Sequence, residues 1–294
     1  MYISNNSMSS NVANTLTSHY GNLATSTQRL STGLRVNSAA DDAAGLAIRE
    51  LMRSDVTALQ QGIRNANDAI SLLQTADGAL SIIDEKLIRM KELAEQAATG
   101  TYDSTQRLMI ESEYQQMASE ITRIANATDF NGIHLLDGTL SSDTHVGNEL
   151  TSTGKMKIHF GTNNDSAEDY YYIQIGSTTA SSLGVGNQAT STSNAYTVST
   201  QDAAQRALVG LTDAIVSKDK IRAHLGALQN RLENTISNLT TQSENLQSAE
   251  SRISDVDVAS EMTNFVRNQI LTQSAVAMLS QANSMPQMAM RLIG

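Results

Sequence analysis

The chain contains no cysteine, no tryptophan and a single proline among its 294 residues, and aromatic residues make up only 4% of it. Without cysteine it has neither disulfides nor thiolate chemistry, although this does not fix a compartment. Because proline breaks helices, one proline leaves long helices almost uninterrupted. Few aromatic residues leave little large apolar area for a compact core. The composition therefore favours long, thinly packed helices that bury leucine, isoleucine and alanine along seams.

The sequence also lacks an excess of positive charge, a long apolar run and the pattern of a cleavable leader. With a formal net charge of −10, the chain is not expected to bind nucleic acid. No run approaches the roughly 18 apolar residues of a membrane span, so no span is expected. The first 18 residues lack the basic and apolar regions of a secretory signal. We therefore expect a protein that stays inside the cell or leaves by a route that reads no such signal.

A seven-residue apolar repeat runs through the first half of the chain. Leucine or alanine recurs at every seventh position from Leu59 to Ala94, with a second apolar series between. This spacing predicts a coiled-coil-like helix held for about five heptads. A second helix, capped by Asp103 with Gln106 three positions on, is expected to return antiparallel to the first.

The second half carries a matching repeat on a very long helix, expected to open at a capping box of Ser199 and Asp202. Ser254 is the expected cap of a last, weaker helix. Strong seams pair most simply with each other, so we expect the N- and C-terminal halves to lie antiparallel, with the two termini together. The leucines assigned to the core seam are Leu73, Leu80, Leu87, Leu225, Leu232, Leu239 and Leu246.

In the middle of the chain the apolar period changes to two. Apolar and polar residues alternate over residues 155–160 and 170–175, with a polar loop between, which predicts a β-hairpin. Residues 176–199 are rich in Ser, Thr, Gly and Asn and are expected to form a loop. The predicted fold class is therefore mainly α, with long antiparallel coiled-coil-like helices and a small β-hairpin region in the middle.

No motif for catalysis, for a cofactor or for a metal stands in the sequence. The five histidines are scattered, and no H-E-x-x-H, Walker or G-x-S-x-G pattern occurs. The adjacent Asp41 and Asp42 stand among small residues, where a metal would need further oxygen ligands. Acids there also suit the start of the helix that follows, at its positive end. We therefore expect no catalytic, cofactor-binding or metal-ligating residue, and no enzyme.

Several stretches, in order along the chain, resemble bacterial flagellins. In the N-terminal half they are TQRLSTGLRVNSAADDAAGLAI, RNANDAISLLQTADGAL, LIRMKELAEQAATGTY and FNGIHLLDG. In the C-terminal half they are ALQNRLENTISNL, AESRISDVDVASEMTNF and ILTQSAVAMLSQANSMPQMAMRLIG. The resemblance covers roughly residues 1–140 and 200–294. The chain departs from the family in the middle, where flagellins commonly carry large, variable outer domains.

The resemblance implies a structural subunit of the bacterial flagellar filament. This filament lies outside the cell and serves swimming motility. It implies that the chain is exported unfolded through the flagellar type III apparatus and then self-assembles. The implied partners are further copies of the chain, an export chaperone at the C-terminal helix, and the filament cap and hook-junction proteins.

The resemblance also implies a division into three regions. Residues 1–44 and 251–294 would form the inner-core helices with a connecting spoke, and residues 45–140 and 200–250 the outer-core helical rod. Residues 141–199 would form the hairpin and a short variable linker. The residues assigned by analogy to the spoke and its subunit contacts are Arg35, Asn37, Ala40, Asp41, Asp42 and Gly45.

The resemblance further implies recognition by the flagellin-sensing Toll-like receptor of hosts. Arg89, Leu93 and Glu113 fall on the family's contact positions, although Met117 replaces an arginine found in some recognised members. On the residues alone, Leu93 equally suits a seam position and Arg89 a solvated helix face.

Three other interpretations stay open. A hook–filament junction protein would share the terminal plan, but it matches the quoted motifs less closely. An enzyme displayed on a filament would need an outer domain with a metal motif, and residues 141–199 offer neither the length nor the ligands. A secreted adhesin or ligand module is the third.

The terminal segments carry narrow apolar stripes on otherwise polar sequence. Isolated helices are marginal without tertiary burial, and ordering a chain costs about 1–2 kcal/mol per residue. We therefore expect residues 1 to about 40 and about 255 to 294 to be disordered in the monomer and helical only after assembly.

Overall fold

The computed structural model of the chain describes residues 6–146, 153–166, 168–190 and 192–293. It divides the chain into two compact units. The terminal unit comprises Met1–Val56 and Glu244–Gly294, and the central unit comprises Thr57–Ser243. The boundaries fall inside two long helices, Ala43–Ala98 and Gln201–Ser254, so each of these helices contributes residues to both units.

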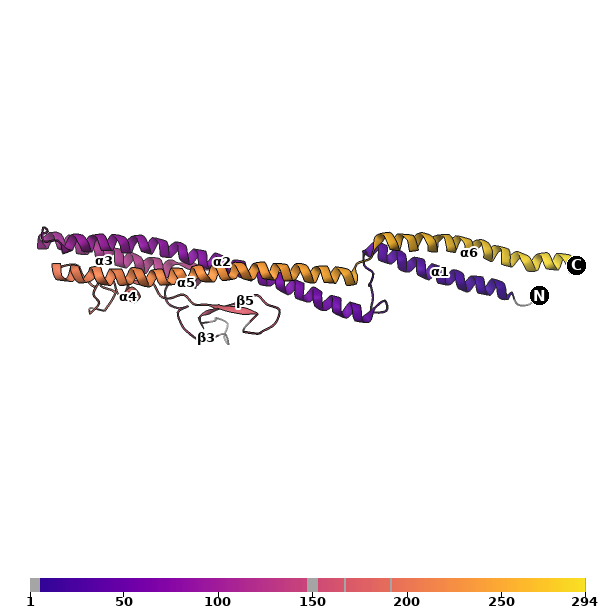
Figure 1. Ribbon diagram of the computed structural model, residues 1–294, viewed down its shortest axis with the longest axis horizontal. Coiled ribbons are helices and arrows are strands. Elements are labelled where there is room, and N and C mark those ends of the chain that lie inside the picture. The colour runs from indigo at the N-terminus through magenta and orange to yellow at the C-terminus, as the bar shows by residue number, and fades with distance from the viewer. Residues whose placement is uncertain (1–5, 147–152, 167, 191, 294) are drawn as a thin grey trace. The chain divides into compact units, whose positions relative to one another are not determined.

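The described secondary structure is dominated by long helices from both halves of the chain (Figure 1). The helices are α1 (Ser7–Thr32), α2 (Ala43–Ala98), α3 (Ser104–Ala127), α4 (Ala180–Leu183), α5 (Gln201–Ser254) and α6 (Val258–Ile293). The strands form three antiparallel pairs: β1 (Asp129–Phe130) with β2 (Ile133–His134), β3 (His145–Val146) with β4 (Thr153–Gly154), and β5 (Met156–His159) with β6 (Tyr170–Ile173). The predicted fold class is confirmed.

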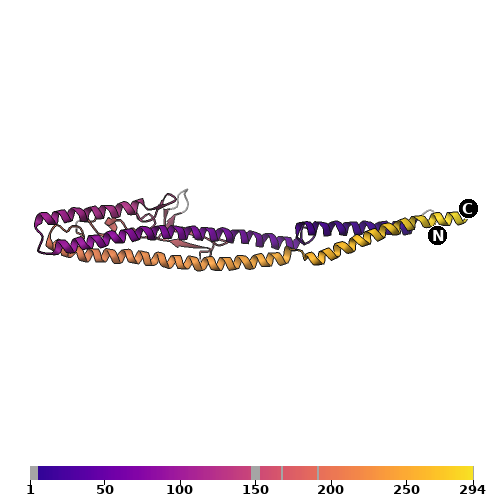
Figure 2. The ribbon, with the colours of Figure 1, turned by 90° about the horizontal axis from the view of Figure 1, so that it is seen from above.

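The core of the central unit lies between α2, α3 and α5, which run side by side in both views (Figures 1 and 2). Every member of the heptad series of α2, from Leu59 to Ala94, is buried. Leu246 belongs to the terminal unit, where it is half-buried. The other leucines assigned to the seam are all buried in the central unit: Leu73, Leu80, Leu87, Leu225, Leu232 and Leu239.

Ion pairs between α5 and α2 interrupt this apolar seam. Lys218 is only 1% exposed, and its Nζ lies 2.6 Å from Asp84 Oδ1. One turn further along α5, Arg222 Nε lies 2.7 Å from Asp77 Oδ1, and this hydrogen bond raises the pKa of Arg222. A buried charge without its partner is costly, so the pair of Lys218 with Asp84 favours a single register of α5 against α2.

The start of α3 agrees with the sequence, whereas the start of α5 differs by one residue. Gln106 Oε1 accepts a hydrogen bond from the backbone N–H of Asp103 at 3.0 Å, which completes the predicted capping box. The hydroxyl that caps α5 belongs to Thr200 rather than to the predicted Ser199, because Thr200 Oγ1 lies within reach of the Ala203 N–H at 3.2 Å.

The cap of α6 also differs from the prediction. Ser254 is the last residue of α5, and its hydroxyl donates to Asp255 Oδ1 at 2.9 Å. Asp257 takes the capping role, since its Oδ1 accepts from the Ala259 N–H at 3.0 Å. The neighbouring Asp255 accepts instead from the hydroxyls of Ser251 and Ser254 at the end of α5.

The segment between the hairpin and α5, predicted as loop, contains α4 and is held against α3. The hydroxyl of Tyr114 donates to the Ala195 carbonyl at 2.6 Å, and the Val198 N–H donates to Glu111 Oε2, also at 2.6 Å. Burial raises the pKa of Tyr114 well above its ordinary value. These polar side chains of α3 give the linker a fixed path that its own composition does not indicate.

The predicted hairpin is confirmed as β5–β6, and it packs closely against α2. A Cβ atom on Gly62 would lie 1.9 Å from the Phe160 carbonyl oxygen, so only glycine permits this approach. The Asn65 side chain donates to the His159 carbonyl at 2.8 Å. A glycine and an amide on one face of α2 thus set the position of the hairpin.

We expect Gly62→Ala to destabilise the central unit by at least about 1 kcal/mol, because the added methyl group collides with backbone that must move. Gly78→Ala is the matched control on the same helix, since a Cβ there meets nothing within 4 Å. It should stabilise by about 0.5–1 kcal/mol through helix propensity. Thermal melting of both variants measures the difference, and equal stabilisation by the two would contradict the close contact.

Candidate assembly surface

The segments that join the helices of the terminal unit form a short backbone ladder, here called the junction (residues 33–42 and 253–257). The Arg35 N–H donates to the Ser254 carbonyl at 2.6 Å, and the Val256 N–H donates to the Gly33 carbonyl at 3.0 Å. Gly33 has a φ of 73°, the left-handed conformation that ends α1. The Arg35 guanidinium also donates to the Ile253 carbonyl at 2.7 Å. The junction therefore ties the end of α1 to the end of α5.

Asp41, the first of the two adjacent acids, shapes the backbone of the junction. Its Oδ2 accepts from the N–H of Ser38 at 2.9 Å, from the Ser38 hydroxyl at 3.0 Å and from the N–H of Asn37 at 3.2 Å. These bonds, led by the Ser38 N–H, hold the pKa of Asp41 below its ordinary value. The carboxylate thus acts as an internal acceptor for a turn.

Asp42, the second acid, caps α2. Its Oδ1 accepts from the N–H of Gly45 at 2.8 Å. A Cβ on Gly45 would lie 2.4 Å from Asp42 Oδ2, so the glycine gives the carboxylate room. Both acids are engaged within the chain, as a turn acceptor and a helix cap.

Two other residues assigned to the spoke differ in their surroundings, since one bonds within the chain and one is open to solvent. Asn37 donates from Nδ2 to Thr32 Oγ1 at 2.9 Å, and Ala40 is exposed. Sequence reasoning missed Val36, which is 2% exposed and whose carbonyl accepts from Arg49 Nη1 at 2.9 Å. The signal for Val36 was its apolar side chain among polar and small neighbours.

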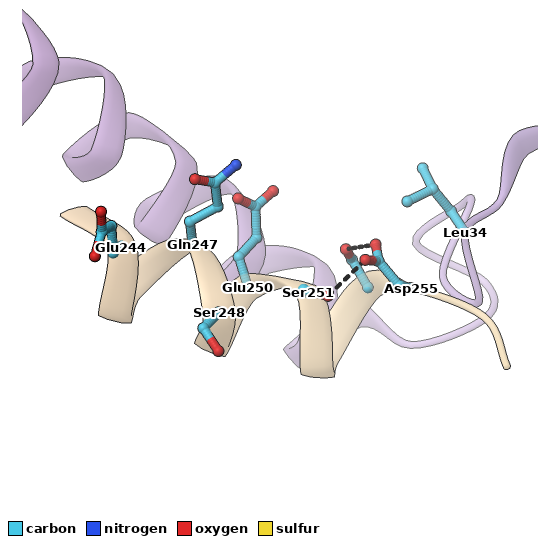
Figure 3. Close-up of a pocket in the computed structure, with 8 residues that line it drawn as sticks. Leu34, Glu244, Gln247, Ser248, Glu250, Ser251 and Asp255 are labelled. Carbon is cyan, nitrogen blue, oxygen red and sulfur yellow. Dashed lines mark hydrogen bonds between the residues drawn. The ribbon is translucent and has the colours of Figure 1, made fainter.

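A groove of about 540 Å³ lies along the last turns of α5 in the terminal unit (Figure 3). The hydroxyls of Ser251 and Ser254 donate to the carboxylate of Asp255 at 2.6 and 2.9 Å. Gln247 and Glu250 project to the same side of the helix in Figure 3. The lining residues are Leu34, Glu244, Gln247, Ser248, Glu250, Ser251, Ser254 and Asp255. The groove presents carboxylates, serine hydroxyls and the amide of Gln247, a surface suited to polar contacts with another chain.

Helix α6 exposes a row of large apolar side chains, here called the outer stripe of α6. Its members recur every four residues: Val258, Met262, Val266 and Ile270. The residues of α6 that are buried are different ones, including Glu261 and Ala282. Arg29 of α1 lies 3.8 Å from Glu261, and Asn6 donates to the Ala282 carbonyl at 2.9 Å. Helix α1 therefore covers one face of α6, and the outer stripe lies on another.

An outer stripe of this kind indicates association. A helix that is apolar on more than one face is stable when both faces are covered. Ile270 is 56% exposed, and further large apolar residues of the terminal unit are exposed as well: Ile48, Leu51, Leu271, Val276, Met278 and Met288. Exposed apolar surface on this scale marks a site of protein–protein contact.

The residues matched to the receptor patch do not all lie on the surface. Arg89 and Glu113 are exposed and paired, with 2.8 Å between Arg89 Nη2 and Glu113 Oε1. The bond to Glu113, with a second to Glu92, raises the pKa of Arg89. Leu93 is 1% exposed and belongs to the core, the seam position that its spacing also allowed. Arg89 and Glu113 thus form the accessible part of the patch.

Metal-binding and membrane-spanning features are missing from the part of the chain that the structure describes. No three His, Cys, Asp or Glu side chains gather there to hold a metal ion. None of the described helices is long and apolar enough to cross a membrane. Buried seams, an exposed outer stripe and a junction closed by its own side chains are the features of a helical structural protein.

The comparisons with known proteins agree with this class. The bacterial flagellin N-terminal helical region matches residues 3–141, and the bacterial flagellin C-terminal helical region matches residues 208–293. The chain therefore belongs to the bacterial flagellins, the structural subunits of the flagellar filament.

Individual relatives match most of the chain. It is 42% identical over 266 residues to a flagellar filament 33 kDa core protein of Treponema phagedenis, covering 90% of each chain. It is 40% identical over 309 residues to a flagellin of Bacillus subtilis, covering all of both. A structure described as a flagellar hook-associated protein of Vibrio parahaemolyticus has a TM-score of 0.54 at 15% identity, covering 73% of this chain and 100% of that one. That last likeness concerns the fold alone.

We expect the turn around Asp41 to loosen in acid. Because its pKa is lowered in the folded state, the contribution of Asp41 is complete above its ordinary pKa of 3.8 and is lost as the pH falls through the lower folded value. The amide resonance of Ser38, followed by NMR on the assembled protein, in which we expect this segment to be folded, should titrate with a midpoint below 3.8. Asp41→Asn should abolish that titration. A midpoint at or above 3.8 would show that the hydrogen bonds do not form in solution.

Proposed function

We propose that this chain polymerises into the flagellar filament through the outer stripe of α6 and the neighbouring surfaces of the terminal unit. The observation that carries the proposal is that α6 keeps large apolar side chains exposed after α1 has covered one of its faces. Each fully buried apolar side chain contributes about 1.5–3 kcal/mol, so covering the stripe with other copies would be strongly favourable.

The proposed division of the filament follows from the resemblance and the two seams. Residues 1–44 and 251–294 would form the inner core with its connecting spoke, and residues 45–140 and 200–250 the outer core. Residues 141–199 would form the surface hairpin and linker. The weak apolar stripe of α1 and the outer stripe of α6 support the inner assignment, because both need other chains to become fully buried.

The double variant Met262→Gln with Ile270→Gln tests the contact. Both side chains are exposed in the single chain, so the melting of the monomer should change by less than about 0.5 kcal/mol. The lowest concentration that supports filament growth, scored by negative-stain electron microscopy, should rise at least about tenfold.

The matched control is Met262→Leu with Ile270→Leu, which keeps the apolar surface and should polymerise near the wild-type concentration. Filaments from the glutamine variant at that same concentration would remove the outer stripe from the interface. Failure of the wild-type chain to polymerise under any condition would overturn the proposed function itself.

Export and assembly are proposed to be coupled to folding. The structure gives α1 and α6 as helices, the form that they would take in the filament. Their mutual contact is narrow, and ordering some 80 residues costs on the order of 80–160 kcal/mol at about 1–2 kcal/mol per residue. Disordered ends would suit passage through the type III apparatus, capture of the C-terminal helix by an export chaperone, and later placement at the filament cap or the hook junction.

Mild proteolysis tests this coupling. In the monomer, protease should trim both ends to a resistant core of roughly residues 45–250 that no longer polymerises, because unfolded backbone is the substrate of proteases. Assembled filaments should resist the same treatment. Survival of intact ends in the monomer would show that the terminal helices fold without a filament.

Recognition by the flagellin-sensing receptor is proposed to use Arg89 and Glu113. Both are exposed on the central unit, whereas Leu93 would act by supporting the helix beneath them. The Arg89 guanidinium has other N–H groups besides those bonded to Glu113 and Glu92. Its planar fork suits a contact with a receptor carboxylate.

Arg89→Ala should reduce receptor activation by monomers at least about fivefold, while the exposed pair contributes little to folding. Arg123→Ala is the matched control, since Arg123 is also exposed and paired, with Glu120. Activation is measured in reporter cells with melting recorded in parallel. An equal loss from both variants would assign the effect to general charge.

A further inference from the structure

We propose that the outward face of the β5–β6 hairpin binds an anionic polysaccharide of the polyuronate type. The strand register separates two faces. The pairs Lys157 with Tyr172 and His159 with Tyr170 lie on one face. The alternate residues, Phe160 and Ile173 among them, are buried against the core. The outward side chains are therefore not needed to fill the core.

The outward side chains form a continuous row of rings with cations above it. The Tyr170 and Tyr172 rings meet edge to face with centroids 5.4 Å apart. His159 stacks on Tyr170 at 6.0 Å, and His145 of β3 lies against Tyr172 at 5.5 Å. The Nζ atoms of two lysines lie over the tyrosine rings: Lys157 at 3.6 Å from the Tyr170 centroid and Lys155 at 4.5 Å from the Tyr172 centroid.

The row consists of two similar Lys–Tyr units. Their tyrosine ring centroids lie 5.4 Å apart, so the two units follow each other closely along the hairpin. A repeated site suits a ligand that is itself a repeat. Each unit offers an ammonium group and the part of a tyrosine ring that the lysine leaves uncovered. A uronate residue presents the matching groups, namely an apolar ring face, hydroxyls and one carboxylate.

The row offers few cations to a nucleic acid. Tight binding to a polyphosphate uses on the order of 6–10 phosphate contacts, and the row supplies two lysines. The chain as a whole carries a net charge of −10. Asp143 accepts from Gln174 Nε2 at 3.0 Å, and Asp169 is 7% exposed with Oδ2 accepting from the Asp165 N–H. These nearby acids oppose any dense polyanion, so binding of an oligouronate rests on the two lysines and on contact of its apolar sugar faces with the tyrosine rings.

An internal role for the lysines alone does not explain the whole row. A lysine over a tyrosine ring stabilises a surface by about 0.5–1 kcal/mol, and Lys157 Nζ donates besides to Asn164 Oδ1 at 3.2 Å. Tyr172 nevertheless stays 36% exposed, which leaves part of the aromatic row open to a ligand. The site belongs to the central unit and requires no polymerisation, so it stands apart from the proposed filament contacts.

Binding is tested on the full-length monomer with an oligogalacturonate, followed by calorimetry at moderate salt. Wild-type protein should bind it saturably, and the methyl-esterified oligomer, which has the same rings without charge, at least about tenfold more weakly. Lys155→Gln with Lys157→Gln should weaken binding of the acid form by at least about tenfold. Tyr172→Leu should also weaken binding of the acid form, by at least about fivefold.

The charge-matched control is Lys91→Gln with Lys220→Gln, two exposed lysines outside the row, which should change the affinity by less than about twofold. Melting of every variant separates loss of the ligand contact from loss of the hairpin. Absence of saturable binding by the wild type, equal losses in the control, or tighter binding of a single-stranded oligonucleotide of equal charge would each overturn the proposal.

Discussion

The burial of one apolar stripe of α2 between α3 and α5 is the interaction on which the rest of the central unit depends. Alanines such as Ala66, Ala76 and Ala94 let the helices approach closely, and the leucines between them supply most of the apolar area. The pair of Lys218 with Asp84 then favours one register. Only with that register set can α3 hold the linker and α2 accept the hairpin at Gly62, because both contacts need backbone at defined positions.

The terminal unit follows the same helical plan with much less burial. The contact between α1 and α6 contains buried polar residues such as Ser26 and Thr272, and the buried Nδ1 of His19 has no hydrogen-bond partner among the described residues. Many of its large apolar side chains are exposed instead, among them the outer stripe of α6. Such exposed surface suits a subunit of a polymer, because apolar side chains that are exposed in one chain favour association when neighbouring chains bury them.

Much of this architecture is present in local patterns of the sequence. The heptads of α2 and the alternation in β5–β6 each indicate which face of one element is buried, and every residue of the α2 heptad series is buried as predicted. The turn between β1 and β2 is equally local, because Asn131 and Gly132 both adopt positive φ, of 53° and 80°. Helix caps were less certain, since Thr200 and Asp257 have neighbours that make equally good caps.

The sequence by itself determined the helical seams, the hairpin and the family, because periodicity and motif are properties of contiguous residues. Tertiary structure alone decided what each face meets. In the folded chain Leu93 lies in the core while Arg89 stays exposed. Lys218 pairs with Asp84, 134 positions away in the sequence. Tertiary structure also closed the carboxylates of Asp41 and Asp42 onto their own backbone. The physical reason is that the spacing of residues along the sequence determines which of them share one face of a helix or strand. What that face contacts depends on the distant segment that packs against it.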